Sequence, residues 1–79
     1  MTAPSVLLYT RDGCHLCEDA RRVLLEHRLA LTEIDIDSDA GLIERYGQCV
    51  PVVVVDGRER FRGHVDGALL RRLLAGRKP

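Results

Sequence analysis

Ser5-Val-Leu-Leu-Tyr-Thr-Arg-Asp-Gly-Cys-His-Leu-Cys17 is the stretch on which the fold depends, because its pattern changes halfway along. Residues 5–10 form an apolar, β-prone run, which predicts a buried strand. Residues 11–13 are turn formers, and from His15 apolar residues recur at helical spacing to about Arg28. Both cysteines therefore lie where a buried strand gives way to an amphipathic helix.

The middle of the chain predicts an edge strand followed by a short helix. Residues 31–37 alternate apolar and acidic side chains with a period of two, which suits an edge strand. Ser38 or Asp39 can cap the next helix. Gly47 can end it, because glycine tolerates the left-handed conformation that often follows a helix.

The C-terminal part predicts a hairpin and a last helix. Residues 50–55 are almost all β-branched, which suits a strand buried on both faces. Asp56-Gly57 favours a tight turn into a second strand at 58–62. Leucines at helical spacing predict a helix over 65–75, and a polar tail follows at 76–79.

The predicted order of elements is β-α-β-α-β-β-α. A strand-helix-strand unit gives two parallel strands, and the later hairpin adds an antiparallel pair. We therefore expect an α/β fold with one mixed four-stranded sheet flanked by helices. A chain of 79 residues supports a single domain, over residues 1–79.

The composition argues against several classes of function. Twelve basic and twelve acidic residues give no charge imbalance that would attract nucleic acid or an anionic membrane. No apolar run reaches the roughly 20 residues of a membrane span, and residues 1–4 are too short and uncharged for a signal peptide. Three cysteines suit a reducing compartment better than a disulfide-stapled secreted domain. We expect a cytoplasmic monomer without nucleic-acid or membrane partners.

The Cys14-His15-Leu16-Cys17 motif is the main chemical signal. Free N–H groups and the helix dipole at a helix start favour a thiolate at Cys14. Cys17 lies on the same side one turn later, so it can attack a mixed disulfide formed by Cys14. The pattern predicts Cys14 as the catalytic nucleophile and Cys17 as the resolving thiol.

Charged neighbours of the motif act in opposite directions. Arg11 adds positive charge that favours a thiolate, or is simply a solvated side chain, whereas Asp12, Glu18 and Asp19 oppose ionisation if they point the same way. His15 either tunes the thiol when it is protonated or faces solvent.

Several features together resemble a glutaredoxin-like protein of the thioredoxin superfamily, over nearly the whole chain. They are the first strand, the CxxC motif at a helix start, Val50-Pro51 opening a strand, and a hairpin followed by Gly63. The resemblance implies a thioredoxin-like fold and a thiol–disulfide oxidoreductase that reduces disulfides. It also implies a cis Pro51 whose dipeptide backbone pairs with an extended substrate segment. Arg11, Val50, Pro51 and Gly63 are the substrate-binding residues that it predicts.

The sequence departs from glutathione-binding members of the family at three places. Cys-His-Leu-Cys stands in place of a Cys-Pro-Tyr-Cys type loop, Cys49 in place of the threonine of Thr-Val-Pro, and Arg62 in place of the first glycine of Gly-Gly. Two reducing systems stay open, one coupled to glutathione and one of the thioredoxin-reductase type. The substrate is a disulfide-containing protein or glutathione as co-substrate, and no bound cofactor is expected.

Cys49 has three interpretations: a small inert hydrophobe, a third redox thiol, or a metal ligand. The alternative function is accordingly a zinc or iron–sulfur module that binds its metal through Cys14, Cys17, Cys49 and either His15 or His64. A closed zinc site usually has a second compact pair of ligands, which this chain lacks. The oxidoreductase interpretation assigns no metal. A domain that keeps the fold without turnover is the third alternative, because fold does not fix function.

Overall fold

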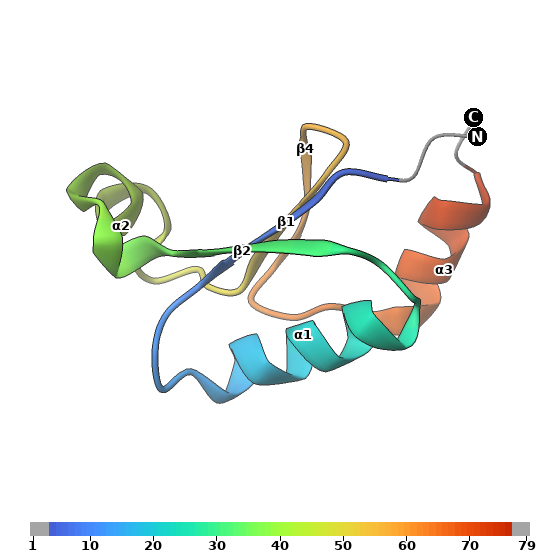
Figure 1. The fold of residues 1–79 in the computed structure, drawn as a ribbon, viewed down its shortest axis with the longest axis horizontal. Helices are drawn as coiled ribbons and strands as arrows, with labels where there is room; N and C mark the ends of the chain where they lie inside the picture. Colours follow the sequence, from blue (N-terminus) through green and yellow to red (C-terminus); the bar gives the residue numbers. More distant parts are fainter. Residues whose placement is uncertain (1–3, 77–79) are drawn as a thin grey trace.

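The computed structural model describes residues 4–76, which form one sheet, three α-helices and a short 3₁₀ helix (Figure 1). Only Gly76 of the predicted tail and Pro4 of residues 1–4 are among the described residues. The elements in chain order are β1 (Val6–Thr10), α1 (His15–Glu26), β2 (Leu31–Asp35), η1 (Ile36–Ser38), α2 (Ala40–Tyr46), β3 (Val52–Val55), β4 (Arg58–Arg62) and α3 (Gly67–Ala75).

The four strands lie in the order β2-β1-β3-β4. β1 pairs parallel with β2 and antiparallel with β3, and β3 pairs antiparallel with β4. The predicted mixed sheet and the edge position of the second strand are therefore confirmed. Asp56 and Gly57 both have positive φ, at 50° and 82°, as a tight two-residue hairpin turn requires.

Alternate residues of the central strands pack on opposite faces of the sheet. One face meets α1, which runs below the sheet in Figure 1, and α3, which stands at the right-hand end. The cluster there contains Val6, Leu8, Ala20, Leu24, Leu29, Val53, Val55, Val65 and Leu70. The other face is covered by η1 and α2, because Ile36 of η1 and Tyr46 of α2 pack in one cluster with Val52 of β3. The ring centroids of Tyr9 and Tyr46 lie 4.7 Å apart.

The predicted edge strand is shorter than its alternating pattern suggests. β2 ends at Asp35, whose side chain accepts the N–H of Asp37, while Ser38 donates its hydroxyl to the Asp35 carbonyl. These local bonds replace strand pairing. Ile36 thus lies in η1, fully buried beneath α2, and does not continue the strand.

The left-handed conformation predicted for Gly47 is wrong. Its φ is −53°, and its N–H donates to the Ile43 carbonyl at 2.8 Å, so it continues the helical path. A Cβ at this position would lie 2.5 Å from that same oxygen. Space, and not backbone handedness, requires a glycine there.

The helix caps explain two further boundaries. Asp39, one of the two predicted caps, accepts the N–H of Gly41 at the start of α2. Asp66 accepts the N–H groups of Ala68 and Leu69, so α3 begins at Gly67, two residues later than predicted.

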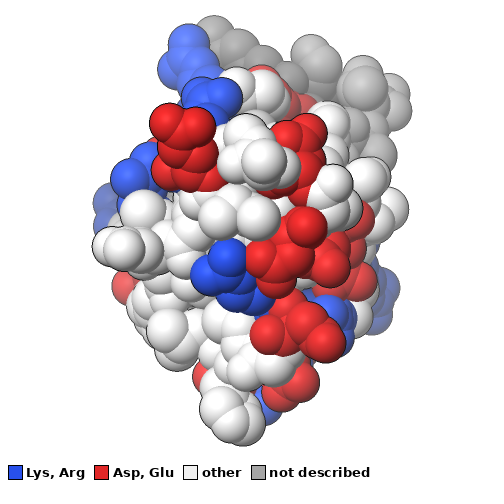
Figure 2. Space-filling model, turned by 90° about the vertical axis from the view of Figure 1, so that its left-hand side faces the viewer, with Lys and Arg blue, Asp and Glu red and all other residues white. Residues whose placement is uncertain are grey.

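Acidic and basic side chains lie close to one another on the end of the molecule shown in Figure 2. Among the described residues, four ion pairs join arginine and carboxylate groups at 3.2 Å or less. Within residues 4–76, none of the helices is both long and apolar enough to cross a membrane.

Candidate active site

The two cysteines of the motif lie at the carboxyl end of β1 and the start of α1. Gly13 makes the preceding turn with a φ of 74°, a conformation that favours glycine. Cys14 is the N-cap of α1, and its Sγ accepts the backbone N–H of Cys17 at 3.2 Å. The predicted placement of the first cysteine at a helix start is confirmed.

The environments of the two thiols differ sharply. Cys14 is partly exposed, whereas Cys17 has only 2% of its surface exposed. Burial, followed by a hydrogen bond with Cys14, raises the pKa of Cys17 to about 11, although the Arg11 backbone and the Arg21 charge act in the opposite direction. Cys17 therefore keeps its proton at neutral pH, and Cys14 is the thiol that an incoming disulfide can reach.

Arg11 uses its side chain to join elements beside the motif. Its Nε and Nη2 both donate to Asp37, at 2.9 to 3.2 Å, and its Nη1 donates to the Gly47 carbonyl at 3.1 Å. The ion pair raises the pKa of the guanidinium further. Arg11 thus connects the end of β1 to η1 and to the end of α2, and its predicted role in substrate binding stays a prediction.

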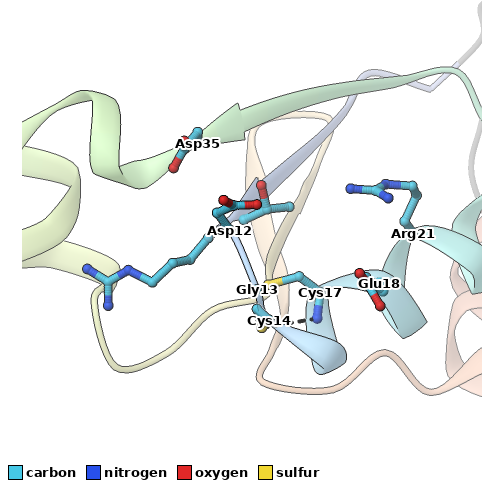
Figure 3. A pocket seen from close by; sticks show the side chains of 9 residues that line it. Asp12, Gly13, Cys14, Cys17, Glu18, Arg21 and Asp35 are labelled. Carbon is cyan, nitrogen blue, oxygen red and sulfur yellow. Dashed lines mark hydrogen bonds between the residues drawn. The ribbon is translucent and has the colours of Figure 1, made fainter.

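A pocket of about 160 Å³ opens beside the two cysteines (Figure 3). Its walls come from the end of β1, the following turn, the first turns of α1 and the end of β2. The lining residues are Thr10, Arg11, Asp12, Gly13, Cys14, Cys17, Glu18, Arg21 and Asp35. The pocket therefore brings the cysteine pair together with three carboxylates and two guanidinium groups.

Sequence reasoning missed Asp35 and Arg21 as members of this pocket. Asp35 ends β2, the parallel neighbour of β1, and the carboxyl ends of parallel strands meet at one edge of a sheet. Arg21 follows Cys17 by four residues on α1, which places both on one face of the helix. Both spacings are visible in the sequence, so both positions could have been inferred.

The Val50–Pro51 peptide bond is cis, as the resemblance implies. Pro51 is buried, and its carbonyl accepts the N–H of Gly63 at 2.7 Å; Gly63 has a φ of 80°. Val50 is partly exposed, and its own N–H and C=O have no backbone partner within residues 4–76. The Val50 backbone is thus available for pairing.

His15 and Cys49 lie outside the pocket lining. The His15 side chain is 97% exposed, with Nδ1 3.9 Å from a Glu18 oxygen. Cys49 packs against the cluster beneath α2, and its sulfur lies 3.7 Å from Nη1 of Arg62. A tuning role for His15 and a redox role for Cys49 remain predictions.

The metal-module alternative requires Cys14, Cys17 and Cys49 to converge on one centre. Among residues 4–76, however, no three His, Cys, Asp or Glu side chains are grouped so that they could hold a metal ion. The ligand set proposed for that alternative is therefore not assembled within the described part of one chain.

Comparison with known proteins places the chain in a family. The family model of the glutaredoxin-like domain (DUF836) matches residues 5–75. An uncharacterized protein of Mycobacterium tuberculosis is 36% identical over 90% of this chain and 82% of its own length.

Solved structures share the fold. Protein XcR50 from X. campestris is 37% identical, with a TM-score of 0.79 over 94% of this chain and 100% of that one. Glutaredoxin grx-1 from Archaeoglobus fulgidus has a TM-score of 0.67 over 91% and 87% of the two chains; at 21% identity it supports the fold alone. The predicted thioredoxin-like fold is confirmed.

Proposed function

The chain belongs to the glutaredoxin-like domain family, and from this premise we propose that it is a thiol–disulfide oxidoreductase. The observation that carries the proposal is the difference between two adjacent thiols. Cys14 is accessible at a helix N-cap, while Cys17 is buried and protonated within hydrogen-bond reach of it. A nucleophile followed by a protected resolving thiol is the arrangement that two-step disulfide exchange needs.

The reaction proceeds in two exchanges. The Cys14 thiolate attacks one sulfur of a substrate disulfide, which forms a mixed disulfide and releases the other substrate sulfur as a thiolate that takes a proton from solvent. Cys17 then loses its proton and attacks Cys14 Sγ, which releases the second substrate thiol. Two electrons and two protons pass to the substrate, and the protein is left with a Cys14–Cys17 disulfide.

The Val50-Pro51 segment is the proposed docking site for the substrate backbone. Its unpaired Val50 groups support antiparallel pairing with an extended peptide, in the manner of strand addition. Gly63 holds the Pro51 carbonyl and so positions this segment. Arg11 contributes by fixing the end of β1, from which the CxxC turn begins.

A thiol reductant must return the disulfide to the dithiol. Two molecules of glutathione, which leave as glutathione disulfide, or the dithiol of a reductase of the thioredoxin-reductase type can each supply the two electrons. We place the protein in a reducing compartment such as the cytoplasm, where the dithiol form persists.

The experiment uses the fully reduced protein and a neutral small disulfide, hydroxyethyl disulfide, without any regenerating system. The wild type should consume one equivalent and become oxidised at Cys14 and Cys17. Cys14→Ser should not react, whereas Cys17→Ser should stop at a stable mixed disulfide on Cys14. Full reactivity of Cys14→Ser would contradict the assigned nucleophile, and failure of the wild type to react would contradict the function.

A further inference from the structure

We infer that the substrates of this site are disulfides flanked by lysine or arginine, and that anionic disulfides such as glutathione disulfide react poorly. The inference rests on the proposed function and names its substrate class. It depends on the charges around the pocket of about 160 Å³ beside Cys14 and Cys17.

The three carboxylates of the pocket lack strong cationic partners. Asp12 and Asp35 form no ion pair within residues 4–76; the Asp35 carboxylate accepts the N–H of Asp37, and its charge helps to raise the pKa of Arg11. Glu18 lies 3.9 Å from His15, which is a partner only when protonated. All three residues line the pocket.

The two arginines that line the pocket offset that charge only in part, because each is paired with a carboxylate, although Arg21 still lowers the pKa of Cys17. Arg11 is bound by Asp37 through three contacts, and Arg21 is bound by Glu33 at 2.6 Å. The lining residues alone have three carboxylates and two guanidinium groups, an excess of one negative charge; with the paired Asp37 and Glu33 included, the excess is three. The whole chain, by contrast, has a formal net charge of zero. A thiolate at Cys14 adds to the local excess.

A cleft with an excess of one sign of charge concentrates ligands of the opposite sign and raises their association rate, by roughly 10- to 1000-fold in favourable cases. Glutathione disulfide carries more carboxylates than ammonium groups, so it approaches against this field. A peptide with lysine or arginine beside its disulfide places cations near Asp12, Glu18 and Asp35. The field therefore selects substrates at the encounter step.

The test compares two disulfide peptides of equal length, one flanked by lysines and one by glutamates, in single-turnover exchange with the reduced protein. At an ionic strength of about 0.01 M, we expect the cationic peptide to react at least about tenfold faster. At about 1 M salt, where charges are screened within roughly 3 Å, the two rates should converge to within about threefold.

A matched pair of variants assigns the effect to the pocket. Asp12→Asn/Glu18→Gln removes two pocket charges and should reduce the rate ratio by at least about threefold. Glu26→Gln removes a charge at the far end of α1, about 16 Å along the helix axis from His15, and should leave the ratio unchanged.

The outcomes separate the inference from the function beneath it. Equal rates for the two peptides at low salt, or equal effects of both variants, overturn the charge inference while exchange with hydroxyethyl disulfide still upholds the oxidoreductase. If the reduced protein exchanges with none of the three disulfides, which are the two peptides and hydroxyethyl disulfide, both the charge inference and the proposed function are overturned.

Discussion

Cys14 and Cys17 show how three residues of separation can give one element two chemically different thiols. The N-cap position leaves Cys14 at the surface, and the first helical turn carries Cys17 inward beneath the end of β1. Desolvation then keeps Cys17 neutral, which preserves it for the second step of exchange.

This difference predicts selective alkylation of the reduced protein. At pH 7 iodoacetamide should label Cys14 at least about tenfold faster than Cys17, because only a small fraction of Cys17 is thiolate and the side chain is buried. Timed quenching followed by peptide mapping measures both rates. Comparable labelling of the two cysteines would contradict the proposed roles.

Cys49 provides a second prediction at this scale. Its sulfur packs beneath α2 and touches Arg62, away from the residues that line the pocket. Under the inert interpretation, Cys49→Ser should change the single-turnover rate with hydroxyethyl disulfide by less than about threefold, since a partly buried thiol is replaced without touching the pair. A decrease of tenfold or more in that rate would show that Cys49 takes part in the reaction.

Local patterns could predict the residues of the motif but not all of their neighbours. The N-cap position of Cys14 follows from a strand, a turn and a helix read in succession. The Arg11–Asp37 pair joins residues 26 apart in the sequence, so no local spacing indicates it. The charge of Arg11 alone does not predict which way its side chain points.

At the scale of elements, caps and turns set the boundaries that periodicity blurs. The alternation of residues 31–37 continues past the end of β2, because an apolar Ile36 suits both a strand and the buried side of η1. The strand ends at Asp35, whose side chain accepts the N–H of Asp37. Gly47 is the C-cap of α2, as expected, but glycine is required there because a Cβ would collide with the Ile43 carbonyl, not because the backbone turns left-handed.

The cap of α3 gives a prediction at the element scale. Asp66→Ala removes the acceptor for the N–H groups of Ala68 and Leu69 and should lower the free energy of unfolding by about 1 kcal/mol. Asp66→Asn should lose less, because the amide oxygen still accepts. Urea unfolding of the reduced proteins measures both, and equal stability of Asp66→Ala and wild type would refute the assigned cap.

At the scale of the whole molecule, the buried thiol of Cys17 couples proton binding to the free energy of unfolding. The pKa of Cys17 is raised above its ordinary value of 9.0 to about 11, so the folded state binds this proton more tightly than the unfolded chain. The resulting stabilisation is fully present below pH 9 and is lost as pH rises to about 11. Its size is roughly 3 kcal/mol.

Unfolding of the reduced protein in urea between pH 8 and pH 11 measures this term. The wild type should lose about 2 to 3 kcal/mol more than Cys17→Ala over that interval, because the variant has no proton to release there. Parallel pH profiles for the two proteins would show that Cys17 does not titrate as described.

The sequence order of elements was sufficient for the mixed sheet, and the resemblance supplied the cis bond at Pro51. The local charge excess at the pocket could not be predicted, because it depends on which arginines the fold pairs with Asp37 and Glu33. A net charge of zero conceals that distribution.

The most direct test of the central claim is mass spectrometry of the intact protein equilibrated with defined ratios of oxidised and reduced dithiothreitol, with thiol alkylation and peptide mapping. We expect a reversible loss of two hydrogens that maps to a disulfide between Cys14 and Cys17, with Cys49 alkylated throughout. A protein whose Cys14 and Cys17 stay reduced under oxidising ratios, or whose disulfide includes Cys49, would contradict it.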